Sequence, residues 1–139
     1  MANWIGFART NYFHVTDIDA LTKSLSGFEL TPTVSVVDKS LFCILCESDD
    51  GGWPAWGEVD GEDLDFSFQE IVMPFVAEGE VLVVMECGAE RLKYLTGFAA
   101  AYVRRGDSVK ELTIELSDIY RMVSEKFGVK LSAVSLCAY

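Results

Sequence analysis

Hydrophobic and polar residues along this chain recur with two different periods, which predict strands in some segments and helices in others. Over Phe7–Val15 the side chains alternate, so Tyr12 and His14 face one way while Phe13 and Val15 face the other. This alternation is typical of a strand with two unlike faces. We therefore predict a first strand in this segment.

A helix is predicted immediately after this strand. Thr16 is placed to begin it, with Asp19 three residues later as a weaker form of the capping box, and Gly27 marks its end. The apolar residues of the segment fall on one helical face: Ile18, Leu21 and Leu25. A β-hairpin is expected next, because two apolar runs, Thr33–Val37 and Leu41–Cys46, flank the turn residues Asp38-Lys39-Ser40.

The middle of the chain contains a second helical pattern. Its apolar positions follow the spacing i, i+3, i+4, i+7, i+8: Phe68, Ile71, Val72, Phe75 and Val76. Pro74 lies inside this pattern and should kink or shorten the helix, because proline has no backbone N–H to donate.

Three consecutive strands are predicted after this helix. The run VLVVMEC over Val81–Cys87 is apolar without alternation, as in a central strand covered on both faces. The next run, YLTGFAAAYV, has rings on one face and small residues on the other, which would let a helix approach closely. Arg105-Gly106-Asp107 then turns the chain into a strand over Val109–Leu116. The rings are Tyr94, Phe98 and Tyr102, and the small residues are Gly97, Ala99 and Ala101.

The last segment predicts a helix and a short strand. Ser117 caps the helix and Gly128 ends it, and a final strand covers Leu131–Cys137. The stripe expected to be buried is Ile119, Met122, Val123 and Phe127. The order is then β-α-β-β, an acidic loop, and α-β-β-β-α-β. We predict an α+β fold in one domain over residues 1–139, with a mainly antiparallel sheet and about three helices.

The amino-acid composition bears on the size of the core and on the cell compartment of the protein. Half of the 139 residues are hydrophobic, which is enough for one core, and no apolar run approaches the 18 residues of a membrane span. The opening MANWIGFARTNYF lacks a charged segment followed by a continuous apolar stretch, so no signal peptide is expected. Together with four cysteines that we expect to be reduced, this favours a cytoplasmic protein without a membrane partner.

Charge is distributed very unevenly. The net charge is −11, and the segment from Ser40 to Glu90 contains 13 acids and no Lys or Arg. Such a segment argues against direct binding of nucleic acid, which needs clustered bases, and favours either a basic protein partner or simple solubility.

Within this segment, the loop over about residues 47–65 combines eight acids with two tryptophans. If it forms a contact surface, the rings act as anchors inside a rim of carboxylates. The competing interpretation is that the rings fold back over the core edge, with Gly51-Gly52 and Pro54 shaping the turn. The candidate partner-binding residues are Asp49, Asp50, Trp53, Trp56, Glu58, Asp60, Glu62, Asp63 and Asp65.

Catalytic and metal-binding patterns are weak by comparison. Cys43 and Cys46 form a C-x2-C, but on a strand these positions point to opposite faces and no second pair exists, so buried apolar thiols are expected. His14 is the only histidine. An EF-hand loop starting at Glu58 has an acid where its glycine belongs and Gln69 where its glutamate belongs. We expect no catalytic residue, metal or cofactor.

Three stretches, NWIGFARTNYFHV, DDGGWP and GEVLVVMECGAERLKYLTG, resemble a group of small acidic proteins carried by plasmids and phages. The resemblance implies a mobile-element setting, in which small acidic proteins often block CRISPR or restriction complexes. The leading hypothesis is a non-enzymatic inhibitor whose acidic face, as a possible DNA mimic, engages a basic, nucleic-acid-handling defence complex. The alternative is a small ligand- or metal-binding domain, or an enzyme, with a pocket near Tyr12, His14 and the acidic loop.

Overall fold

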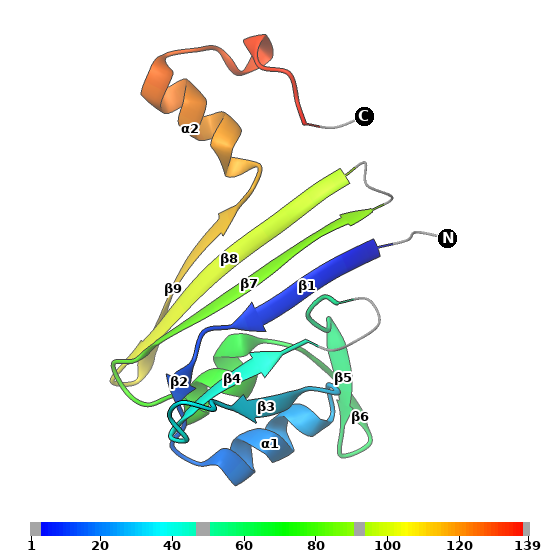
Figure 1. Ribbon diagram of the computed structural model, residues 1–139, viewed down its shortest axis with the longest axis vertical. Coiled ribbons are helices and arrows are strands. Elements are labelled where there is room, and N and C mark those ends of the chain that lie inside the picture. The colour runs from blue at the N-terminus through cyan, green and yellow to red at the C-terminus, as the bar shows by residue number, and fades with distance from the viewer. Residues whose placement is uncertain (1–3, 47–50, 91–93, 138–139) are drawn as a thin grey trace.

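The computed structural model describes residues 4–46, 51–90 and 94–137 of the chain. Figure 1 shows a long twisted sheet with helices beside it and a C-terminal helix that extends beyond the end of the sheet. The strands are β1 Trp4–Thr10, β2 Phe13–His14, β3 Thr31–Val34, β4 Leu41–Leu45, β5 Trp56–Val59, β6 Glu62–Asp65, β7 Val81–Glu90, β8 Tyr94–Arg105 and β9 Ser108–Glu115. The helical segments are α1 Ile18–Ser26, η1 Phe68–Val72, η2 Met73–Phe75, α2 Asp118–Phe127 and η3 Leu131–Ala133.

Seven of these strands form one sheet in the order β2-β4-β1-β7-β8-β9, with β3 paired to β4, while β5 and β6 form a separate hairpin. Each of the paired strands runs antiparallel to its neighbour. The α+β class, the mainly antiparallel sheet and the three predicted helical regions are therefore confirmed.

The predicted strand over Phe7–Val15 is wrong in one respect, because the chain leaves the sheet at Asn11. At Asn11 the backbone N–H still donates to Val83 O at 3.0 Å, and the side chain adds two further hydrogen bonds to β7. Its Nδ2 donates to Val81 O at 3.0 Å, and its Oδ1 accepts from Val83 N at 2.8 Å. The edge of β7 stays hydrogen-bonded while the chain turns away to form β2 against β4.

Thr10 joins the two halves of the sheet. Its side chain is buried, and its Oγ1 accepts a hydrogen bond from Ile44 N at 2.9 Å and donates one to Asn11 O at 2.8 Å. The backbone pairing of β1 with β4 is otherwise short, with Arg9 opposite Leu45. A buried hydroxyl therefore replaces part of a β-ladder at this junction.

Helix α1 begins one residue later than the sequence suggested. Asp17 is the cap, with its Oδ1 accepting from Ala20 N at 3.0 Å, whereas Thr16 lies in the bend before the helix and donates its N–H to Phe75 O. The end at Gly27 is confirmed. The β3–β4 hairpin is also confirmed, although its first strand covers Thr31–Val34 and not the predicted Thr33–Val37. In its turn, hydrogen bonds from the side chain and backbone of Ser40 lower the pKa of the Asp38 carboxyl.

The helical pattern around Pro74 folds into two short pieces. A wide π-helical turn, η1, is followed by the 3-10 turn η2, which contains Pro74. The shortening expected from the missing proline N–H is therefore present. The apolar residues of η1 nevertheless reach the core, as their spacing predicted: Phe68, Ile71 and Val72.

The core lies on one face of the sheet only. Helix α1 and the η1–η2 turns cover Leu82 and Val84 of β7 and Ala100 and Tyr102 of β8, and Phe98 packs at the edge of the same cluster. Burial, followed by the negative charge of Glu111, raises the pKa of the Tyr102 phenol. The third residue predicted on this face, Tyr94, has a side chain that the structure does not describe.

Two predictions about the other face are wrong. The strand β7 is not covered on both faces, because Val81, Met85 and Cys87 point to solvent. No described helix packs on the small residues Gly97, Ala99 and Ala101 either. The reason is that α1, η1 and η2 all lie on the opposite face, while α2 extends away from the sheet (Figure 1).

The C-terminal segment differs most from its prediction. Helix α2 ends at Gly128, which has a left-handed φ of 66°, but none of its side chains is buried, so the expected buried stripe is wrong. Ser117 occupies the N-cap position without a side-chain cap bond; Asp118 instead accepts from Glu115 N at 2.7 Å. The predicted strand Leu131–Cys137 is also wrong: within it the chain forms the 3-10 turn η3 followed by irregular backbone.

Replacing Thr10 by Val should test the junction between β1 and β4. The substitution keeps the side-chain shape but leaves the buried N–H of Ile44 without its acceptor. We expect the free energy of unfolding to fall by about 1–3 kcal/mol. Urea denaturation measures this, with Thr33→Val on the exposed surface of β3 as the matched control, expected to change stability by less than about 0.5 kcal/mol. Equal effects at both positions would contradict the role given to Thr10.

Candidate functional site

The acidic loop contains a two-stranded hairpin, β5–β6, that the predicted element order did not include. Its turn is Asp60-Gly61, and both residues have positive φ, 53° and 82°. Two consecutive residues of positive φ are what a tight hairpin turn requires, and Asp-Gly is a favoured pair for it. The sequence therefore contained a signal for this hairpin, which the density of acids around it obscured.

A close backbone approach holds the hairpin against the body of the protein. Gly57 lies against Gly27 at the end of α1, and a side chain at either position would overlap the backbone of the other segment. Glu58 N donates to Gly27 O at 3.1 Å across this contact. Next to it, Val59 packs against the core. One face of the hairpin is thereby fixed against α1.

The other face of the hairpin points outward, and we call it the acidic hairpin face. In the β5–β6 register, Trp56 lies opposite Asp65 and Glu58 lies opposite Asp63. Residues directly opposite one another in an antiparallel pair share a face, as do residues two apart on one strand. The acidic hairpin face therefore consists of Trp56, Glu58, Asp63 and Asp65, all of which are exposed.

The two tryptophans of the loop have different environments. Trp53 packs on the core edge, stacked on Phe66 at a centroid distance of 6.4 Å and edge-on to Phe68 at 4.9 Å. Its backbone N–H donates to Glu86 Oε2 at 2.6 Å, and its indole N–H is buried without an acceptor in the described structure. Trp56, by contrast, leaves 61% of its surface exposed. Trp53 thus fits the interpretation in which a ring folds back over the core edge, and Trp56 fits the one in which a ring is an exposed contact residue.

Carboxylates on the two strands of the hairpin lie opposite one another, and no described cation pairs with them. Glu58 and Asp63 are directly opposed, an arrangement of like charges that weakens a hairpin. Within the described ranges, ion pairs involve only His14, Arg121 and their partners, so no hairpin acid takes part in one. Asp60 and Glu62 extend the negative charge to the turn. Asp49 and Asp50 lie outside the described residues.

The other candidate residues of the sequence do not join the hairpin. His14 is exposed, and its Nδ1 lies 3.0 Å from both carboxylate oxygens of Glu80. Tyr12 is exposed and lies under the guanidinium of Arg9. Cys43 is buried, whereas the Cys46 thiol donates to Gly52 O at 2.6 Å. In the part of the chain that the structure describes, no three His, Cys, Asp or Glu side chains form a group suited to a metal ion.

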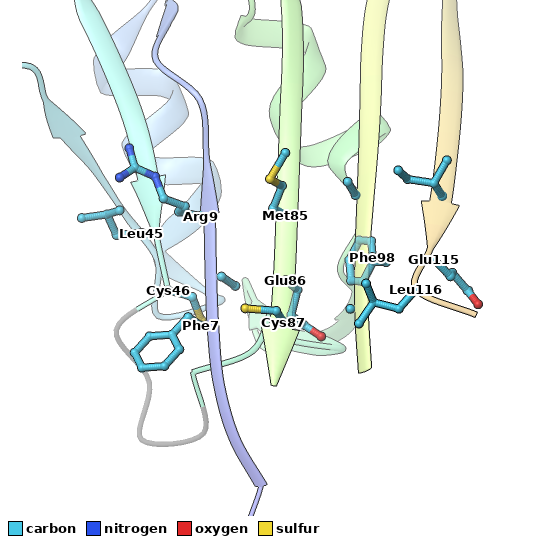
Figure 2. Close-up of a pocket in the computed structure, with 14 residues that line it drawn as sticks. Phe7, Arg9, Leu45, Cys46, Met85, Glu86, Cys87, Phe98, Glu115 and Leu116 are labelled. Carbon is cyan, nitrogen blue, oxygen red and sulfur yellow. The ribbon is translucent and has the colours of Figure 1, made fainter. Parts of the chain in front are cut away.

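A well-formed hollow lies elsewhere, on the uncovered face of the sheet. It has a volume of about 680 Å³, and its lining comes from β1, β7, β8 and β9 with the end of β4 (Figure 2). Phe7, Met85, Ile114 and Leu116 make it strongly apolar. Neither Tyr12, His14 nor any acid of the hairpin lines it, so the pocket that the alternative hypothesis requires is not the one found here.

Comparison with known proteins adds no further constraint: no family model, curated protein or solved structure matches this chain. None of the helices in the described segments is long and apolar enough to cross a membrane. The function must therefore be argued from the surfaces themselves.

Removing one charge from the opposed pair should stabilise the hairpin and, through its contact with α1, the whole domain. We expect Glu58→Gln to raise the melting temperature by about 1–2 °C at low salt. This gain should disappear in 1 M salt, where the Debye length is about 3 Å. Glu70→Gln, at an exposed position away from the hairpin, is the control and should change little. A lower melting temperature for Glu58→Gln would show that its carboxylate has a stabilising partner.

Proposed function

We propose that this protein is a non-enzymatic binding protein whose acidic hairpin face engages a basic surface of a nucleic-acid-handling protein. The observation that carries the proposal is the composition of that face. An exposed indole, Trp56, stands beside the carboxylates of Glu58, Asp63 and Asp65 on a hairpin held against α1. An aromatic anchor inside a charged rim is the arrangement that energetically important protein contacts use.

The opposed acids support the same proposal. Glu58 and Asp63 disfavour the hairpin in isolation, so folding alone does not explain their presence. Against a surface rich in Lys and Arg, the same charges accelerate association and disfavour acidic competitors. Nucleic-acid-binding proteins present such basic surfaces, because they must neutralise phosphates.

Occupying a basic surface would inhibit the partner by competing with its nucleic acid. The spaced carboxylates would then stand in for phosphates, which is the sense in which this protein would be a DNA mimic. A partner in a CRISPR or restriction complex fits the mobile-element setting that the resemblance of the sequence implies. The inhibition requires no chemical step, cofactor or metal.

The proposal is tested by neutralising the face and following the partner. Tagged protein is used to capture partners from cells that carry defence systems, at 50 mM and 500 mM salt. A triple variant, Glu58→Gln with Asp63→Asn and Asp65→Asn, should lose most of the low-salt capture. Its matched control removes the same charge elsewhere, with Asp19→Asn, Glu70→Gln and Asp107→Asn, and should capture like the wild type.

Kinetics with a captured and purified partner then separate the two components of the face. The triple variant should associate about 10-fold more slowly or worse at low salt, with a flatter salt dependence, because long-range attraction acts on the association rate. Trp56→Ala should mainly speed dissociation, because an anchor acts after encounter. If the triple variant associates at the wild-type rate at low salt, the acidic hairpin face is not the binding surface.

A further inference from the structure

A second surface is independent of the acidic hairpin: the uncovered face of the large sheet, which we call the open face. It is formed by β1, β7, β8 and β9, and Figure 2 shows its side chains projecting from neighbouring strands. Seven large apolar side chains on this face are more than half exposed: Ile5, Phe7, Met85, Leu95, Leu112, Ile114 and Leu116. Val81, at 44% exposure, and the charged residues Arg9 and Lys110 share the same face. Monomeric proteins commonly expose apolar patches of only a few hundred Å².

The alternation in the second half of β9 indicates that this part of the open face is normally covered. There, Leu112 and Ile114 point to the open face, while Glu111 and Thr113 point to the side where the helices lie. In the first half of the strand the order is reversed, with Lys110 on the open face and Val109 against the core. A strand at a surface that stays in water places its polar residues there. In the second half of β9 the apolar set is on the side that nothing in the described chain covers.

Helix α2 carries a matching surface. Ile119, Met122 and Phe127 lie along one side of it at helical spacing and are exposed, Phe127 by 75%. The opposite side is polar, with Arg121 donating to Glu125 at 3.1 Å. An amphipathic helix of this kind is stable when its apolar side rests on another apolar surface.

The junction between β9 and α2 directs this helix away from its own sheet. Only Leu116 and Ser117 separate the two elements. Leu116 N donates to Gly97 O, which extends the pairing with β8 up to the helix, and Ile119 N donates back to Leu116 O. Asp118 closes the junction through its bond from Glu115 N. The helix therefore continues past the end of the sheet, as Figure 1 shows.

We propose that the open face is covered by helix α2 of a second copy of this chain, in a symmetric dimer in which the two copies exchange α2. Exchange of α2 between identical copies covers both the open face and the apolar side of α2 in each chain. Short connections such as the one before α2 favour this kind of exchange. The interface is also large enough. At about 100 Å² each, the three exposed apolar side chains of α2 offer about 300 Å², and the sheet loses a similar area, so the two exchanged contacts bury about 1,200 Å², the lower end of the range for stable protein interfaces.

Sedimentation velocity and light scattering of the full chain test this dimer. The wild type should be a dimer at 10 µM. Ile114→Lys on the open face and Met122→Lys on α2 should each raise the dimer dissociation constant by about 100-fold or more, because each puts an unpaired charge into an apolar contact. Met122 lies on an exposed helix surface, so its substitution leaves the core intact even if Ile114→Lys disturbs folding.

Each substitution has a neighbouring control. Thr113→Lys is on the opposite side of the same strand, and Ser124→Lys is about 200° from Met122 around the helix. Both should stay dimeric. The proposal is overturned by a wild type that stays monomeric at 100 µM, by Met122→Lys with unchanged dimer affinity, or by controls that weaken the dimer as much as the test variants.

Mixing the two weakened variants tests the exchange itself. Ile114→Lys keeps an intact α2, and Met122→Lys keeps an intact open face, so together they can rebuild one of the two contacts. We expect the mixture to form heterodimers with at least about 10-fold higher affinity than either variant has for itself. A dimer in which two sheets or two helices pack on each other predicts no such gain in affinity. A mixture without the gain would therefore refute the exchange.

Discussion

The structure depends on the register of β7 with its two neighbours. Because β7 pairs with β1 on one side and β8 on the other, one alignment decides which side chains of three strands reach the core. Leu82 and Val84 point to α1 and the η1–η2 turns, and Val81 and Met85 point away. A slip by one residue would reverse both sets. The close packing of the core and the solvent exposure of apolar side chains on the open face are therefore two results of the same register.

The two surfaces proposed for binding differ in physical character and lie on different parts of the fold. The acidic hairpin face is small, charged and attached to the end of α1, so its interactions depend on ionic strength. The open face is broad and apolar, so it is governed by burial of area. A dimer formed through the open face leaves both hairpins free of that interface. Two acidic hairpin faces on one particle could engage a partner with repeated basic sites more strongly than one.

Much of the fold could be predicted because its elements have strong local patterns. The helical spacing of Leu21 and Leu25, the shortening at Pro74 and the stop at Gly27 were all readable. Failures came where the outcome depends on distant parts of the chain. The apolar run of β7 looks the same whether one face or two are covered, and the pattern of α2 does not reveal what covers it. Within the site, the acids of the loop were evident, but local sequence cannot tell which tryptophan faces the core.

The two hydrogen bonds from the Asn11 side chain to β7 have a consequence for the chemical stability of the protein. A side-chain amide has an NH2 group that donates and a carbonyl oxygen that accepts, and here the NH2 group bonds Val81 O while the oxygen bonds Val83 N. Asparagine is among the residues that degrade with time and heat, and hydrolysis converts its amide to a carboxylate. The product would set a negative charge against the Val81 carbonyl where a donor stood. Loss of this amide would therefore weaken the point where β1 leaves the sheet and leave the packed interior intact.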